Sequence, residues 1–441
     1  MLPRSFPTFR DARLSVLQAA AAAVAHIRAP GSTPGLERAA GSVASMQASG
    51  AAVPVQAPSG IDPAAWLCAR LGWQLLQSEL WGDAAQRSRL EDELLGSRCD
   101  PLWAGTLVDY LGYFGPDGRR AAIPYIRPEV AGPAVIEIAS DARVALLSDW
   151  GTGRPTARAV LQDLAQRQPD VLVHLGDIYY AGTAAECERN FRQPITAELR
   201  AGGRNPAVYT LSGNHDMYSG GEGYYGLIDH LNDGPARQRA SYFCLRSADR
   251  RWQFLAMDTG LHAYDPFERR PLTRLERDEE EWLLARIAEF EGQTVLLSHH
   301  PLFSALARIG PGGPDPWNPN LLASFRRLAA SGRIAAWFWG HEHTMALYAP
   351  YVGLARGRCI GCGAIPMFVA DRLYEPLAGL RDSPALLPPR LGNDGTVQDH
   401  GYAVVTLEPT SGVARAEYYG VGARTGLLYT ETFGEPGSTK T

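Results

Sequence analysis

The sequence has almost no lysine: Lys440 is the only one, and all other residues among the 42 basic positions are arginine. We attribute this bias to codon composition rather than to a selected chemistry. Positive charge is also not in excess, because the formal net charge is −5, and nucleic-acid binding through the whole surface is therefore not expected. The sequence also lacks any run near the roughly 18 apolar residues that a membrane span requires, so no span is expected.

Cysteine is scarce as well, with six in 441 residues, which is too few for a disulfide scaffold. Cys359 and Cys362 form a CxxC pair, but no second pair follows, so we interpret it as the end of a strand rather than a zinc ribbon. The alanine-rich stretch 18–27 has no clear cleavage site after it, and we expect a cytoplasmic protein. Four isolated cysteines are predicted to be buried thiols: Cys68, Cys99, Cys187 and Cys244.

Three regions follow from composition. Residues 1–60 include a tract of Ala, Gly, Ser and Pro, which predicts a segment that is flexible or draped over the fold. Residues 61–128 have helical periodicity, with a stripe of tryptophans that indicates a packed face and a second helix expected at 101–113. Residues 129–441 form the third region and the main predicted domain.

In that domain, short apolar strands alternate with helices. The clearest helices are expected at 155–168 and 273–290. This alternation predicts a layered α/β fold whose sheets are buried on both faces. Strands are expected at 135–138, 144–147, 171–173, 208–211, 254–257, 295–297, 334–339 and 402–407.

Polar residues stand directly after several of these strands, at the position where open α/β sheets place their sites. Histidine is rare, with ten in the chain, so its recurrence at strand ends is informative. Carboxylates mixed with imidazoles suit transition ions such as Fe, Mn or Zn, and the donors are too many for one ion, which favours two ions sharing a carboxylate. The strand ends carry Asp149, Asp177 with Tyr180, Asn214 with His215, His299 with His300, and His341 with His343.

The ordered motifs D, GDxxY, GNHD, HxP and GHxH resemble those of the calcineurin-like metallophosphoesterases, over about residues 143–407. The first motif is Asp149-Trp150-Gly151 rather than D-x-H, and the second extends to Tyr180, as in the purple acid phosphatase branch. A phenolate in place of a missing histidine would favour Fe(III). The resemblance implies a four-layer α/β/β/α sandwich with a helical N-terminal extension.

The resemblance also implies the metal ligands. They form two sets that share Asp177: the first also contains Asp149, Tyr180 and His343, and the second also contains Asn214, His299 and His341. Fe(III) is expected at the tyrosine site, with Fe(II), Zn(II) or Mn(II) at the other.

The implied reaction is hydrolysis of a small phosphate monoester by a metal-bound hydroxide. His215 would act as general acid, with Asp216 as a group that orients it. His300 is a further substrate-binding candidate, and so is Arg308, which stands where relatives carry another histidine and would either grip a phosphate oxygen or be exposed.

Two other functions remain open at this stage. The same metal pair would serve a phosphodiesterase acting on cyclic nucleotides or other diesters. The chain would otherwise be a metal-binding scaffold with vestigial catalysis, in which the N-terminal helices recruit a partner. The sequence does not indicate the oligomeric state.

Overall fold

The computed structural model describes most of the chain from residue 123 onward. The described residues are 123–200, 203–263, 273–307, 309, 314–369 and 372–434, with 42, 46, 52–54, 56–60, 66, 70, 74, 86, 109 and 113 nearer the N-terminus. The regions predicted for residues 1–60 and 61–128, including the helix at 101–113, therefore lie almost wholly outside them, as does Arg308.

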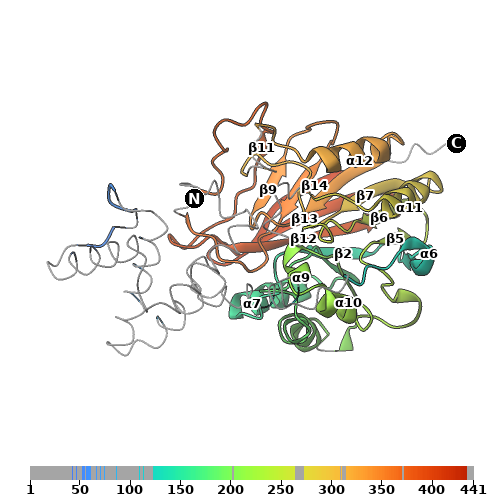
Figure 1. Cartoon of the computed structure of the whole chain (residues 1–441), viewed down its shortest axis with the longest axis horizontal. Helices are drawn as coiled ribbons and strands as arrows, with labels where there is room; N and C mark the ends of the chain where they lie inside the picture. Colours follow the sequence, from blue (N-terminus) through green and yellow to red (C-terminus); the bar gives the residue numbers. More distant parts are fainter. Residues whose placement is uncertain are drawn as a thin grey trace.

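Two mixed β-sheets form the centre of the described structure (Figure 1). The eight-stranded sheet has the order β1 (Val135–Ile138), β5 (Phe243–Ser247), β6 (Trp252–Ala256), β7 (Gln293–Leu297), β8 (Ile334–Trp339), β10 (Gly357–Ile360), β9 (Met345–Tyr348) and β11 (Leu386–Leu387). The six-stranded sheet has the order β14 (Gly426–Phe433), β13 (Val413–Val421), β12 (His400–Glu408), β2 (Arg143–Leu147), β3 (Val171–His174) and β4 (Ala207–Thr210).

The sheets pack face to face. Alternate side chains of each strand enter either the core between the two sheets or the core between a sheet and its helices. In β2, Val144 and Leu146 enter the core between the sheets, whereas Ala145 and Leu147 face the helices. In β8, Phe338 enters the same inner core and Trp337 packs on the outer side of the other sheet. Continuous apolar runs such as these are expected of strands that are covered on both faces.

Helices cover the two outer faces (Figure 1). Helices α11 (Arg277–Ala288) and α12 (Pro319–Ala329) pack against the eight-stranded sheet, and α7 (Pro155–Gln166) packs against the six-stranded sheet. The predicted α/β/β/α sandwich is thereby confirmed. The shorter helices are α6 (Pro128–Ala131), α8 (Ala184–Glu186), the π-helical turns η1 (Cys187–Arg192) and η2 (Ile195–Leu199), α9 (Asn214–Met217), α10 (Glu222–Ile228) and the 3₁₀ turn η4 (Gly234–Ala236).

The cysteines follow the sequence expectation where the structure describes them. Cys187, Cys244, Cys359 and Cys362 are buried free thiols. Cys359 lies in β10 and Cys362 follows it, so the CxxC pair does end a strand. Among the described residues, no helix has both the length and the apolar character needed to cross a membrane.

Candidate metal centre

The loops after β2, β3, β4, β7 and β8 meet at one point between the two sheets. Asp149 follows β2 and Asp177 follows β3, while Asn214 begins α9 after β4. His299 follows β7, and both His341 and His343 follow β8. Parallel pairing of β2 with β3 and of β3 with β4 aligns the carboxyl ends of the first three strands, which is why distant motifs meet.

Local backbone shape turns four of these residues toward the centre. Asp149, Asp177, His341 and His343 all have positive φ angles, of 55°, 73°, 68° and 44° respectively. Non-glycine residues rarely adopt this conformation, and it is retained where the surroundings impose it, often at functional sites.

Two glycines in the motifs are needed because ligand-type side chains approach the backbone closely. A Cβ atom on Gly213 would lie 2.1 Å from Oδ1 of Asp177. A Cβ atom on Gly340 would lie 1.8 Å from Oγ of Ser148 and 2.6 Å from Oδ2 of Asp149. The glycines of GNHD and GHxH therefore make room for the carboxylates of the first two motifs.

The first cluster joins Asp149, Asp177 and His343, whose ligand-type atoms lie within 4.8 Å of one another. Nε2 of His343 lies 3.3 Å from Oδ1 of Asp149. The hydroxyl of Tyr179 lies 3.0 Å from Oδ1 of Asp149, 3.2 Å from Oδ2 of Asp177 and 3.0 Å from Nε2 of His343.

The tyrosine hydroxyl at this cluster is thus that of Tyr179, one residue before the Tyr180 that the motif spacing predicts. Tyr180 instead contributes its backbone carbonyl, which lies 2.6 Å from Nδ1 of His215. Its side chain packs beside a small apolar cluster that includes Tyr179 and Ile365. The difference arises because motif counting fixes the segment but not the direction in which each of two adjacent tyrosines points.

The second cluster is centred on His299. Its Nε2 atom lies 3.2 Å from Oδ1 of Asn214, 3.2 Å from Nδ1 of His341 and 3.4 Å from Oδ2 of Asp177. Its Nδ1 atom lies 2.9 Å from the carbonyl oxygen of Leu175, which can only accept, so Nδ1 carries a proton and Nε2 is the nitrogen that would bind a metal after losing its own proton. Asp177 contacts both clusters and stands where a bridging carboxylate is expected.

Charge in the buried site is balanced between carboxylates and imidazoles. Burial disfavours ionised Asp177, but His299, His215 and His341 together outweigh this effect and hold the pKa of Asp177 well below its usual value. Burial likewise disfavours charged His299, yet Asp177, with further contributions from Asp149 and Asp216, raises the pKa of His299 to about 9. Anionic oxygens that require positive charge beside them, together with imidazoles, fit transition-metal cations.

Asp216 holds the loops of the site in position. Its carboxylate accepts hydrogen bonds from the backbone N–H groups of Asp177 at 2.9 Å, Ile178 at 3.1 Å and Gly213 at 2.7 Å. These bonds tie the second motif to the third. Nδ1 of His215 contacts the Tyr180 carbonyl, and Asp216 acts as a positioning residue for the loops.

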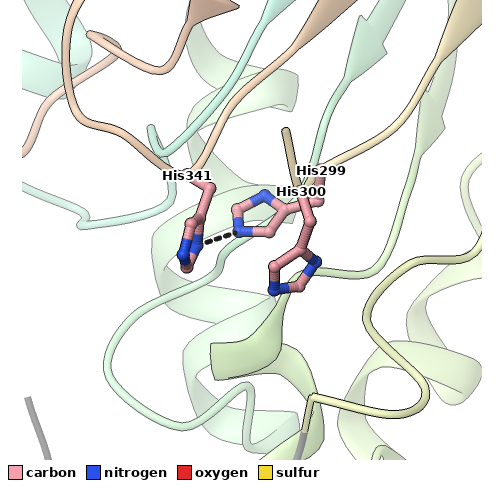
Figure 2. Close-up of side chains that lie close together, drawn as sticks. All are labelled: His299, His300 and His341. Carbon is pink, nitrogen blue, oxygen red and sulfur yellow. Dashed lines mark hydrogen bonds between the residues drawn. The ribbon is translucent and has the colours of Figure 1, made fainter. Parts of the chain in front are cut away.

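His300 lies against the second cluster, as Figure 2 shows for the rings of His299, His300 and His341. Its ring centroid is 4.8 Å from that of His299 and 4.6 Å from that of His341. The sequence analysis missed Thr259, whose hydroxyl oxygen lies 3.2 Å from Nδ1 of His300. The signal was present, because Asp258 and Thr259 are polar residues that follow a strand, as the recognised motifs do.

Comparison with known proteins agrees with this geometry. Residues 142–345 match the model of the calcineurin-like phosphoesterase family. This is the family that the motifs resemble.

One curated relative is a probable cyclic nucleotide phosphodiesterase from a Synechococcus strain. It is 31% identical over 147 residues, which cover 33% of this chain and 48% of the relative. The chain thus spans about half the length of this relative.

Two solved structures are also similar. Purple acid phosphatase PPD1 from yellow lupin seeds has 13% identity and a TM-score of 0.45, with 67% of this chain and 54% of that chain covered. GAP50, described as the anchor in the inner membrane complex of Plasmodium, has 12% identity and a TM-score of 0.46, with 68% and 90% covered.

Proposed function

We propose that this protein is a dinuclear metal-dependent hydrolase of small phosphate monoesters. The observation that carries this proposal is the pair of donor clusters that share Asp177, with His215 beside them. Nε2 of His215 lies 4.0 Å from Oδ2 of Asp177, and the histidine is buried.

The donor sets fit two different cations. Asp149, Asp177, His343 and the Tyr179 hydroxyl offer hard oxygens and one imidazole, which suit Fe(III). Asp177, Asn214, His299 and His341 offer two oxygens and two imidazoles, which suit Fe(II), Zn(II) or Mn(II). Two such cations, when bound, would supply an acidified water and neutralise the charge of a phosphoryl group.

The chain's own residues would orient the substrate and move a proton. The Tyr180 carbonyl accepts from Nδ1–H of His215, which leaves Nε2 to face the reaction centre. A proton held on Nε2 would pass to the leaving oxygen as the ester bond breaks. Asp216 holds the loops of Asp177 and Gly213 together, so that the carboxylate and His215 keep their relative positions.

A phosphodiesterase is the second candidate, because the curated relative is a probable cyclic nucleotide phosphodiesterase. Both reactions use the same donors, so substrates must decide between them. We would load the full-length protein with iron and zinc and compare p-nitrophenyl phosphate, bis(p-nitrophenyl) phosphate and cyclic AMP.

The expected result is a higher kcat/KM for the monoester than for either diester. Asp177→Asn should abolish the activity, whereas Asp229→Asn, at an exposed ion pair with Arg237, should leave it unchanged. Activity on diesters alone would replace the monoester proposal with the second candidate. A fully metal-loaded protein that hydrolyses none of the three esters would favour a scaffold.

A further inference from the structure

His300 is the buried histidine at the second cluster that the predicted ligand sets leave unused. It is 7% exposed, and one of its ring nitrogens lies within 4.8 Å of the ligand-type nitrogens of His299 and His341. Distance alone would make it a third imidazole ligand for the second cation. The hydrogen bonds around its other nitrogen indicate a different task.

The hydroxyl of Thr259 decides which nitrogen of His300 carries the proton. The backbone N–H of His300 donates to Oγ1 of Thr259 over 3.0 Å, so this oxygen acts as an acceptor. The hydroxyl hydrogen still needs an acceptor, because Thr259 is 0% exposed. Nδ1 of His300, at 3.2 Å, provides one.

The alternative tautomer would be costly. If Nδ1 carried the proton, the backbone carbonyl of Thr259 would offer it an acceptor, but the hydrogen of Oγ1 would then be buried without an acceptor among the described residues. A buried polar group without a partner is unfavourable. We therefore assign the lone pair to Nδ1 of His300 and the proton to Nε2.

The neighbouring histidine has the opposite arrangement. A carbonyl oxygen, that of Leu175, faces Nδ1 of His299 and fixes the proton there, which leaves Nε2 as an electron-pair donor suited to a metal. A hydroxyl faces Nδ1 of His300 and leaves Nε2–H as a hydrogen-bond donor. Adjacent histidines on one loop are thus prepared for different partners.

The position of Thr259 is itself fixed by buried contacts. Its carbonyl accepts from the hydroxyl of Thr273. The preceding carboxylate, Asp258, accepts from Ser212 at 2.5 Å and from the N–H of Leu261 at 2.9 Å. The hydroxyl therefore has little freedom to turn away from His300.

We propose that Thr259 holds His300 with its proton on Nε2, and that this N–H donates a hydrogen bond to a non-bridging oxygen of the bound phosphoryl group instead of binding a metal. The phosphoryl part of this inference rests on the proposed function. The tautomer and the absence of a ligand role are independent of it.

The first test measures metal content and phosphate affinity. His300→Ala in the zinc-loaded, full-length protein should keep both zinc ions by elemental analysis and weaken orthophosphate binding about 10-fold or more by calorimetry, as expected for the loss of a hydrogen bond to a charged group. His300→Gln, which restores an N–H donor, should recover part of the affinity. Loss of one zinc ion in His300→Ala would overturn the proposal, and so would unchanged phosphate affinity.

The second test reads the tautomer without any catalysis. Long-range ¹H–¹⁵N spectra of histidine-labelled protein, with His300→Gln used to assign the signal, should show the proton of His300 on Nε2. Thr259→Val should shift this signal toward the other tautomer, and Thr259→Ser should restore it. A proton on Nδ1 in the unmodified protein would refute the assignment even if no ester is hydrolysed.

Discussion

Tyr179 and Tyr180 are adjacent in sequence but contribute different groups to the site. Tyr179 is 1% exposed, and its hydroxyl contacts both carboxylates of the first cluster. Burial, together with Asp149 and Asp177, raises the pKa of Tyr179 well above its usual value. A phenolate there would therefore require a cation beside it, which connects this side chain to metal binding.

Exchange of each tyrosine for phenylalanine separates the two assignments. In the protein loaded with ferric iron, Tyr179→Phe should remove the visible phenolate-to-iron absorption band, because it deletes the hydroxyl at the cluster. Tyr180→Phe is the matched control and should keep the band, since the Tyr179 hydroxyl remains at the cluster. The opposite pattern in the visible spectra would restore the assignment made from motif spacing.

His215 is expected to affect the rate of the reaction without affecting the metals. His215→Asn should lower kcat by about 10²- to 10⁴-fold, the usual contribution of a positioned general acid. Metal content should remain unchanged, because His215 belongs to neither donor set. Esters with a good leaving group need less protonation, so the loss should be smaller for p-nitrophenyl phosphate than for an alkyl phosphate. An equal loss for both esters in steady-state assays would contradict the role.

At the level of elements, helix α11 supports the site through a buried carboxyl group. Glu279 is 0% exposed, and its Oε1 accepts from the N–H of Asp258 at 2.8 Å. The second oxygens of both carboxyl groups, Oε2 of Glu279 and Oδ2 of Asp258, have no hydrogen-bond partner among the described residues. Burial and the nearby Asp258 raise the pKa of Glu279 well above its usual value.

This carboxyl group should make stability fall as pH rises. The unfolded chain ionises Glu279 near its ordinary pKa of 4.5, whereas the folded chain keeps it protonated to higher pH. The contribution of Glu279 to the free energy of unfolding is therefore full below pH 4.5 and is lost as the pH rises above it. Glu279→Gln keeps an acceptor for Asp258 N–H and adds a donor. It should raise the free energy of unfolding by about 1 kcal/mol at pH 8, with a smaller gain near pH 5.

Denaturant unfolding at both pH values measures this effect. Glu281→Gln on the same helix is the control, because its side chain is 58% exposed and pairs with Arg277. That change should shift stability by less than about 0.5 kcal/mol at either pH. A Glu279→Gln protein that is less stable than the unmodified protein at pH 8 would contradict this view. It would show that Glu279 is ionised in the folded protein and that nearby groups compensate its negative charge.

The elements that the sequence predicts well are those with a strong local signal. The bounds of β8 are those expected, because six apolar residues stand between Arg333 and Gly340. Strand β5 was missed, because Arg246 interrupts its apolar pattern. That arginine is buried because it reaches Gln253 in β6 and Glu289 directly after α11, each at 3.0 Å.

Within the site, the ordered motifs predicted the carboxylate, amide and histidine donors that the structure brings together. The motifs could not predict which of Tyr179 and Tyr180 points to the cluster, because that depends on how the backbone turns after Asp177. The motifs also could not predict the role of Asp216, since its partners are backbone N–H groups, which carry no sequence signal.

At the scale of the whole molecule, the sheet that carries the candidate ligands Asp149 and Asp177 is completed from the far end of the chain. Strand β12 pairs with β2 through Ala403, Val404, Val405 and Thr406. Strands β13 and β14 then extend the sheet. The inner core also includes Val405, Ala416 and Tyr418 from these strands. The family match ends at residue 345, so the folding unit extends well beyond the matched region.

A chain that ends after Ala349 should therefore fail to fold. It would keep every candidate metal ligand but expose β2 as an unpaired edge and open the inner core. We expect aggregation and no cooperative thermal transition, whereas a chain ending at Gly434 should unfold cooperatively with the midpoint of the full-length protein. Cooperative unfolding of the shorter chain, with two zinc ions bound, would refute this view.

The pairing of β12 with β2 has a consequence for biosynthesis. A ribosome releases Asp149, His299 and His343 before it has made the strand that closes their sheet. The nascent protein therefore passes through a stage in which the donors exist without a rigid frame. Stable binding of metal at these donors would accordingly be a late step in maturation, after the C-terminal strands have emerged.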